Sequence, residues 1–136
     1  MNHIRRRLLI SVIALVSGLG TALAPAAEPA PREVLVLGGT GQLGAEIVRR
    51  LADRGDRVTV FTRPGSDRRL LEGVPVRYAE GDLLNEAEVT AAFAGNRFEY
   101  VIVAVRVEDG DPHFYGQFLP GLTARAKAAG VVQLIH

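Results

Sequence analysis

The sequence contains no cysteine and no tryptophan, and it has few aromatic residues of any kind. Without cysteine, the chain has no disulfide framework, no thiolate metal site and no cysteine nucleophile. Aromatic residues make up 6% of the 136 residues, too few for the stacking platforms that bind single-stranded nucleic acid. The formal net charge is +1, so the basic excess of a dedicated nucleic-acid binder is also absent. The chain as a whole is 48% hydrophobic, which suits one globular domain.

The first 27 residues differ from the rest of the chain. Three arginines at positions 5–7 are followed by an uncharged, mostly apolar stretch at 8–24 and then by Ala26 and Ala27. A basic segment, an apolar segment and small residues, in that order, are typical of a secretory signal peptide. We therefore predict that residues 1–27 are a cleaved signal peptide. An uncleaved membrane anchor is the alternative, although the apolar stretch is interrupted by glycine and proline.

The predicted location is accordingly periplasmic or secreted, with anchoring in the inner membrane as the alternative. The segment Arg5–Leu9 also resembles the core of a twin-arginine signal, in which two arginines precede any residue and two apolar ones. That route would allow export with a cofactor already bound. Residues 28–32, rich in proline and alanine, are expected to form a short linker to a folded domain at 33–136.

In residues 33–136, strand-like apolar runs alternate with stretches of helical periodicity. Strands are predicted at 34–37, 57–62, 74–80, 100–105 and 131–135, and helices at 42–54, near 70–71, at 85–94 and at 114–129. A continuous apolar run such as Val34–Leu37 is typical of a strand buried on both faces of a parallel sheet. The pattern predicts an α/β fold: a Rossmann-like, doubly wound parallel sheet in the order 3-2-1-4-5, ending after the fifth strand.

Each predicted helix carries a local expectation. In the first helix, four residues are spaced to form one buried apolar stripe: Leu43, Ile47, Val48 and Leu51. Asn85 is expected to cap the second helix. The third helix is expected to be disturbed near Pro120, because proline lacks the backbone N–H that a helix interior requires.

A glycine-rich loop joins the first predicted strand to the first helix, with glycines at positions 38, 41 and 44. Gly38 allows a tight turn, Gly41 lets backbone approach a pyrophosphate, and Gly44 lets the helix pack close to the sheet. The free N–H groups and positive dipole end of the helix then face the phosphates. In its strand–turn–helix context the loop predicts a dinucleotide site, and a ligand-free tight turn is the alternative. No Gly-Lys-Ser/Thr follows, which disfavours a mononucleotide P-loop.

The residue that follows the second strand distinguishes the two nicotinamide dinucleotides. An acid about 20 residues past the loop binds the ribose 2′-hydroxyl of NAD, whereas an arginine accommodates the 2′-phosphate of NADP. Arg63 lies 19 positions after Gly44 and no acid occupies this zone. Arg68 or Arg69 could assist. We therefore predict NADP as the cofactor, with NAD less favoured; a solvated loop arginine is the alternative.

The ends of the third and fourth strands supply further candidate residues. Asp82 could accept a hydrogen bond from the adenine amino group, with Leu83 near the ring. The alternative is a turn aspartate that caps the next helix. Ala104, at the end of the fourth strand, is expected to line the crevice in which the ligand lies.

These segments in their order resemble the N-terminal part of the atypical short-chain dehydrogenase/reductases, and in particular the NmrA-like NAD(P)-binding group. The resemblance covers roughly residues 33–136 and rests on five segments: Val34–Gly44, Thr62-Arg63, Gly81-Asp82-Leu83, Tyr100–Val105 and Ala124–Val131. It implies that Thr40, Gln42 and Leu43 also touch the cofactor. It also implies an oxidoreductase-like protein.

The catalytic groups that the resemblance implies are missing. Active reductases of this kind have a Tyr-x-x-x-Lys pair or a lysine beyond the fifth strand, and here the only lysine is Lys127, expected to face solvent. His113 and His136 have no identifiable partner, so we assign no catalytic residue and no metal ligand. The chain is thus predicted to be an NAD(P)-binding domain whose hydride-transfer and substrate-binding parts lie beyond residue 136 or on a partner chain. The alternative is a non-catalytic NADP-sensing or protein-interaction module.

Overall fold

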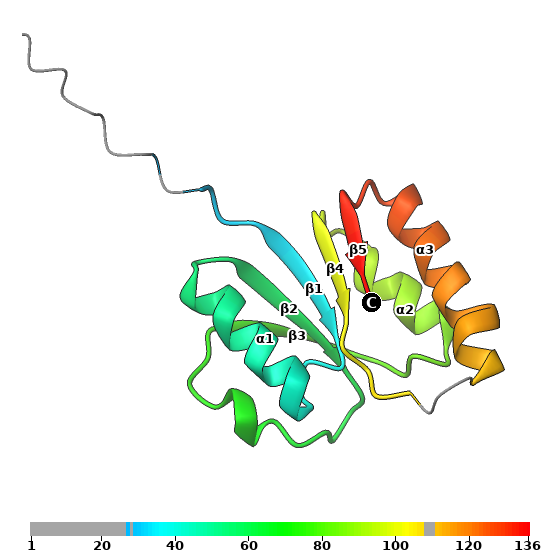
Figure 1. The fold of residues 1–136 in the computed structure, drawn as a ribbon, viewed down its shortest axis with the longest axis horizontal. Helices are drawn as coiled ribbons and strands as arrows, with labels where there is room; N and C mark the ends of the chain where they lie inside the picture. Colours follow the sequence, from blue (N-terminus) through cyan, green and yellow to red (C-terminus); the bar gives the residue numbers. More distant parts are fainter. Residues whose placement is uncertain (1–26, 28, 108–110) are drawn as a thin grey trace, which may run out of the picture.

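The computed structural model describes residues 27, 29–107 and 111–136, in which five parallel strands form one sheet with helices on both faces (Figure 1). The strands are β1 (Glu33–Leu37), β2 (Arg57–Thr62), β3 (Val76–Glu80), β4 (Tyr100–Val103) and β5 (Gln133–Ile135). Their order, β3-β2-β1-β4-β5, confirms the predicted 3-2-1-4-5 arrangement. The predicted signal peptide, apart from Ala27, and residue 28 of the linker lie outside the described residues.

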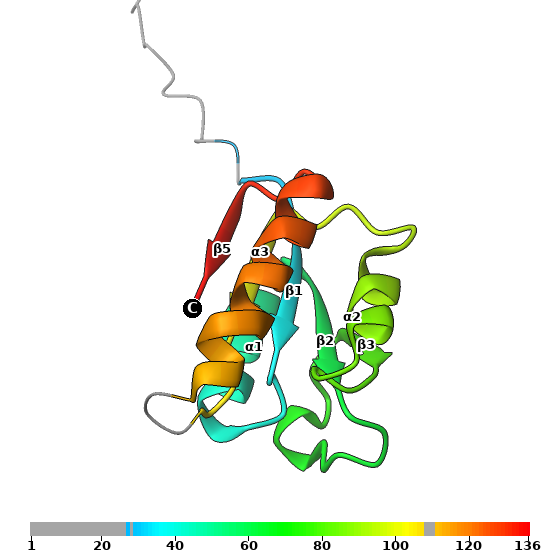
Figure 2. The same ribbon diagram turned by 90° about the vertical axis from the view of Figure 1, so that its right-hand side faces the viewer.

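The helices divide between the two faces of the sheet. They are α1 (Gln42–Asp53), α2 (Glu86–Phe93) and α3 (Leu119–Ala128), with a 3₁₀ turn η1 (Arg69–Leu71) and a π-helical turn η2 (Phe114–Phe118). Figures 1 and 2 show α1 on one face and both α2 and α3 on the other. No helix within the described residues is both long enough and apolar enough to cross a membrane.

The central strand β1 explains why its sequence is a continuous apolar run. Val34 and Val36 pack on one face in a cluster with Ala45 and Val48 of α1. Leu35 and Leu37 pack on the other face in a cluster that includes side chains from α2 and α3. Because both faces of this parallel strand are covered, none of its four core residues shows more than 1% of its surface.

The predicted apolar stripe of α1 is wrong at its first residue. Leu43 is 69% exposed, and the buried residues of this helix are Gly44, Ala45 and Val48. Leu43 lies on a side of α1 that the core does not cover, whereas Ala45 in the same turn packs in a core cluster. Asn85 does cap α2, since its side-chain oxygen accepts from the N–H groups of Ala87 and Glu88 at 3.1 and 3.4 Å.

The predicted disturbance near Pro120 lies in the turn just before it. The Leu119 N–H bonds to the carbonyl of Phe114, five residues back, and so η2 is π-helical. A proline ring clashes with the carbonyl four residues earlier in a regular α-helix, and a wider turn relieves that clash. Strand β4 is also shorter than predicted: it ends at Val103, although the Ala104 N–H still bonds to the Leu37 carbonyl at 2.8 Å.

Candidate functional site

One cleft lies along the carboxyl ends of the strands. Figure 1 shows these strand ends at the lower edge of the sheet. Its volume is about 1400 Å³. The glycine loop after β1, the exits of β2, β3 and β4, and the start of the last helical segment all line it. Ligands of open α/β sheets bind at this edge, where the strand order reverses. The topology therefore brings together residues that are far apart in the sequence.

The cleft gathers nine of the ten residues singled out from the sequence. Those that line it are Gly38, Thr40, Gly41, Gln42, Leu43, Arg63, Asp82, Leu83 and Ala104. The tenth, Gly44, is buried behind the loop. That these residues contact a cofactor stays a prediction, but their common location now has a structural basis.

Two of the three loop glycines are required by the fold itself. Gly38 has φ +79°, and a Cβ there would lie 2.8 Å from the carbonyl oxygen of Ala104. A Cβ on Gly44 would lie 2.1 Å from the carbonyl oxygen of Gly38. No side chain fits at either position without moving backbone, so both keep the loop, β4 and α1 tightly packed.

Gly41 is different, because nothing in the described part of the chain requires a glycine there. Its φ is −75°, which any residue adopts, and a Cβ would meet only the Gly38 carbonyl oxygen, at 3.6 Å. The residue begins α1 without a side-chain cap, and the first turn carries no acid. Within the described residues, the N–H groups of Gln42 and Leu43 have no acceptor. The open space and the free donors fit a diphosphate bound against the backbone.

The end of β2 lies beside this loop. The Oγ1 atoms of Thr40 and Thr62 are 3.4 Å apart, and either can donate. Arg63 follows; it is exposed, lines the cleft and has no ion-pair partner among the described residues. A guanidinium that is not committed to a carboxylate is available to an anion in the cleft.

The two arginines expected to assist Arg63 are committed elsewhere and do not line the cleft. Arg68 pairs with Glu80 and lies 4.1 Å from the centre of the Tyr78 ring. Arg69 pairs with Asp67, and its hydrogen bonds lower the pKa of that carboxyl. Both guanidiniums are therefore held by other side chains: Arg68 by the end of β3, and Arg69 by a residue two positions earlier in the chain.

Asp82 stabilises the turn after β3 but does not cap α2, and its contact with adenine stays a prediction. It is exposed, and its Oδ1 accepts from the Leu84 N–H at 2.9 Å, which stabilises the turn after β3. Its own N–H donates to Glu88 at 2.6 Å. Its Oδ2 accepts no hydrogen bond from the described residues, so it can still accept one from a ligand. The helix cap itself is Asn85, not Asp82.

Sequence reasoning missed the part of the cleft beyond the end of β4. Further residues line the cleft: Ser66 after β2, Leu84 after β3, and Val103, Arg106, Val107, Asp111–Phe114 and Phe118 from the end of β4 onward. The predicted helix at 114–129 did not indicate which of its aromatic rings face the cleft. The available signal was position, because this segment follows the carboxyl end of a central strand.

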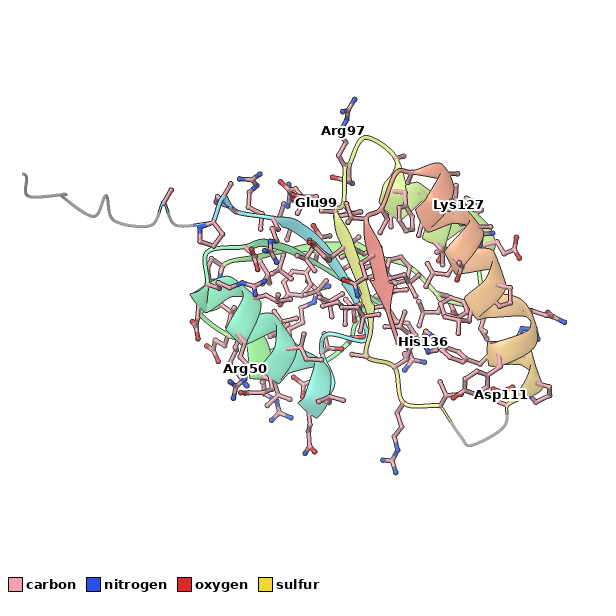
Figure 3. All side chains as sticks on the ribbon, turned by 45° about the horizontal axis from the view of Figure 1, so that its top comes forward. Arg50, Arg97, Glu99, Asp111, Lys127 and His136 are labelled. Atoms are coloured by element: carbon pink, nitrogen blue, oxygen red, sulfur yellow. The ribbon has the colours of Figure 1, made fainter. Side chains whose placement is uncertain are left out.

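The arrangement contains no assembled catalytic group. Lys127 is exposed and lies at the end of α3 opposite Asp111, away from the cleft (Figure 3). His113 lines the cleft without a side-chain hydrogen bond to another described residue. Within residues 27, 29–107 and 111–136 there is also no cluster of three metal-ligating side chains. What this geometry supports is ligand binding.

Comparison with known proteins agrees with this geometry. The model of the NAD-dependent epimerase/dehydratase family matches residues 34–136. Sterol demethylase protein B of Methylococcus capsulatus is 36% identical over 107 residues, which are 75% of this chain and 33% of that protein. UDP-glucose 4-epimerase of Thermus thermophilus, solved with NAD, is 27% identical with a TM-score of 0.58, over 75% of this chain and 36% of that one.

A further solved structure shares the fold. The Bordetella bronchiseptica enzyme WbmH, in complex with NAD⁺, is 22% identical with a TM-score of 0.62, over 78% of this chain and 38% of that one. The chain thus spans about a third of the length of these proteins. The match to the family model covers both the glycine loop and all five strands. The chain belongs to the NAD-dependent epimerase/dehydratase family and forms an NAD-binding domain of that family.

Proposed function

We propose that the cleft binds NADP(H) in preference to NAD(H). The observation that carries this proposal is Arg63, which stands at the end of β2, lines the cleft and has no ion-pair partner among the described residues. An arginine binds a phosphate through two parallel hydrogen bonds, and a 2′-phosphate reaches this position in dinucleotide folds. No carboxylate is available there to bind an unmodified ribose.

The other residues divide the rest of the cofactor between them. The N–H groups of Gln42 and Leu43 would hold the diphosphate, and the exposed Leu43 side chain would be covered by it. Oδ2 of Asp82 would accept from the adenine amino group, with Leu83 against the ring. When bound, the nicotinamide supplies a hydride acceptor or donor. Within the family, the Gly-Asp-Leu after β3 and the arginine after β2 favour an NmrA-like subtype.

Substrate binding and hydride transfer are proposed to need polypeptide outside these 136 residues, either further along the same protein or on a partner chain. What supports this is that the chain spans about a third of the length of its relative. A role in sterol oxidation, suggested by the relative's name, would lie in such a complete protein. A non-catalytic NADP sensor or an interaction module remains the second candidate, favoured by the exposed last residues of β5.

The test is titration of the full chain with NADPH and NADH, followed by nicotinamide fluorescence. We expect saturable binding with NADPH preferred, and Arg63→Ala to weaken NADPH by about tenfold or more while leaving NADH within about twofold. Arg69→Ala is the matched control, because that arginine is in the same loop but pairs with Asp67. Equal loss in both variants, or equal affinity for the two cofactors in the unmodified chain, would refute the NADP preference.

A further inference from the structure

The chain makes a tight turn immediately after Arg63, at the end of β2. Pro64 and Gly65 are the central residues of this turn, and the Ser66 N–H closes it by donating to the Arg63 carbonyl oxygen at 3.1 Å. Gly65 has φ +74°, as a type II turn requires, and proline suits the position before it. Figures 1 and 2 show this segment below the ends of the strands. The turn therefore keeps Arg63 and Ser66 close together, and both line the cleft.

Ser66 offers a hydroxyl group that the protein itself does not use. The residue is half-buried, and its only hydrogen bond within the described residues is the one from its N–H. Two other hydroxyls line the cleft near Arg63, those of Thr40 and Thr62, but their oxygen atoms are 3.4 Å apart and bond to each other. The Ser66 hydroxyl is thus the one beside Arg63 that is free to donate to a ligand.

The segment after Ser66 is fixed to the rest of the domain. Arg68 pairs with Glu80 at the end of β3, and its guanidinium lies 4.1 Å from the centre of the Tyr78 ring. Leu71 of η1 is 3% exposed and belongs to a core cluster. Ser66 is therefore held on one side by the turn to β2 and on the other by these contacts. A donor that is already held in place loses little conformational entropy when it meets a ligand.

A 2′-phosphate needs more hydrogen-bond donors than Arg63 alone supplies. A phosphate monoester presents three acceptor oxygens, and the two parallel hydrogen bonds of one guanidinium leave at least one of them unpaired. The nearby guanidiniums of Arg68 and Arg69 are committed to carboxylates. The free hydroxyl of Ser66 is the remaining donor in this segment that lines the cleft. The 2′-hydroxyl of NAD is uncharged, so a hydrogen bond to it is weaker than one to a phosphate.

We infer that Ser66 is a specificity-determining residue for NADP. Its hydroxyl donates to the same 2′-phosphate that Arg63 binds, and the turn between these two residues positions them as one phosphate site. This inference rests on the proposed function, because it adds a residue to the same cofactor site. Its effect is confined to ligands that carry a 2′-phosphate.

The test titrates the full chain and its variants with NADPH and NADH, followed by nicotinamide fluorescence, and with 2′,5′-ADP by calorimetry. We expect Ser66→Ala to weaken NADPH and 2′,5′-ADP by about threefold to tenfold, because it removes one hydrogen bond to a charged group. NADH, which lacks the 2′-phosphate, should stay within about twofold. Ser66→Thr keeps a hydroxyl and should retain NADPH affinity within about threefold. Ser66→Asp places like charges together and should weaken NADPH by about tenfold or more.

Two further variants show whether Ser66 acts on the phosphate. Thr123→Ala is the matched control, since it removes a hydroxyl on α3 that bonds to the Leu119 carbonyl and does not line the cleft. It should leave the affinities for all three ligands unchanged. The double variant Arg63→Ala with Ser66→Ala should weaken NADPH by less than the product of the two single effects, because both residues hold one group.

The outcomes distinguish failure of this inference from failure of the proposed function. If Arg63→Ala removes a clear NADPH preference while Ser66→Ala changes nothing, the inference is overturned and the proposed function stands. Equal loss of NADPH and NADH in Ser66→Ala also overturns the inference, because Ser66 would then only shape the loop. Single effects that multiply fully in the double variant overturn it as well. Equal affinity of the unmodified chain for NADPH and NADH refutes the proposed preference and this inference with it.

Discussion

At the scale of single residues, Gly44 is required for packing, whereas Gly41 leaves open space in the cleft. We expect Gly44→Ala to destabilise the protein by about 1–3 kcal/mol or more, because its Cβ would lie 2.1 Å from the Gly38 carbonyl oxygen. Gly41→Ala should change the free energy of unfolding by less than about 1 kcal/mol. It should nevertheless weaken NADPH binding by about tenfold, because the methyl group occupies the space left for a phosphate. Urea unfolding and NADPH titration measure the two effects.

The same pair of variants carries its own control. Gly41→Ala must retain the circular dichroism spectrum and melting behaviour of the unmodified chain for its binding loss to be meaningful. If Gly41→Ala binds NADPH as tightly as the unmodified chain, then the open space above Gly41 is not a phosphate site. If Gly44→Ala is as stable as the unmodified chain, then α1 does not pack against the loop as closely as the structure indicates.

At the scale of elements, one carboxylate joins three strands at the edge opposite the cleft. Glu33 of β1 pairs with Arg57 of β2 and Arg77 of β3. Partial burial acts to raise the pKa of Glu33, but the hydrogen bonds and charges of the two arginines outweigh it and lower that pKa. Because the pKa is lower folded than unfolded, the pairs stabilise the fold at neutral pH. That contribution is lost as the pH falls through the folded pKa.

Glu33→Gln should therefore cost about 0.5–1 kcal/mol at pH 7, the range of exposed ion pairs. The difference from the unmodified chain should shrink as the pH falls through the acid range below 5, measured by urea unfolding at each pH. Glu46→Gln, which removes an exposed pair within α1, is the comparison. A Glu33→Gln penalty that is the same at pH 7 and at pH 3 would show that the ion pairs contribute nothing.

The sequence predicted well the elements that are covered on both faces, and it predicted less well which side chains of the elements at the cleft are exposed. The run Val34–Leu37 indicated a central strand, because burial on both faces demands apolar residues at every position. The predicted stripe was wrong at Leu43, because helical periodicity assumes that the core covers every apolar position of α1, whereas Leu43 lines the cleft. The π-turn before Pro120 was expected as a disturbance, but no pattern in the sequence could indicate that it turns Phe114 and not Tyr115 to the cleft.

At the scale of the whole molecule, we propose that the domain is exported. Expressed in a Gram-negative host, the chain should appear in the periplasm with its mature N-terminus at Ala27 or Glu28, as determined by mass spectrometry. Full-length chain in the membrane fraction would instead indicate an anchor. Chain retained in the cytoplasm would contradict export altogether.

The route of export bears on the cofactor. Replacing Arg5 and Arg6 together by lysine keeps the basic charge of a general signal peptide but removes a twin-arginine core. Loss of export in this double variant, with NADPH recovered from the unmodified exported protein, would indicate that the domain folds around its cofactor before it leaves the cytoplasm. Unchanged export would assign the leader to the general route.

The sequence by itself determined the class of this protein. Alternating apolar runs and helical stretches, with glycines at 38, 41 and 44, predict a doubly wound sheet and a dinucleotide loop, because these depend on local periodicity and backbone freedom. Only the tertiary structure decided which groups meet in the cleft. Parallel strands place residues 20–70 positions apart at one edge, where no described residue pairs with Arg63, while Glu80 holds Arg68 nearby. Which arginine pairs with a given carboxylate depends on distances in the folded protein, and no local sequence pattern indicates it.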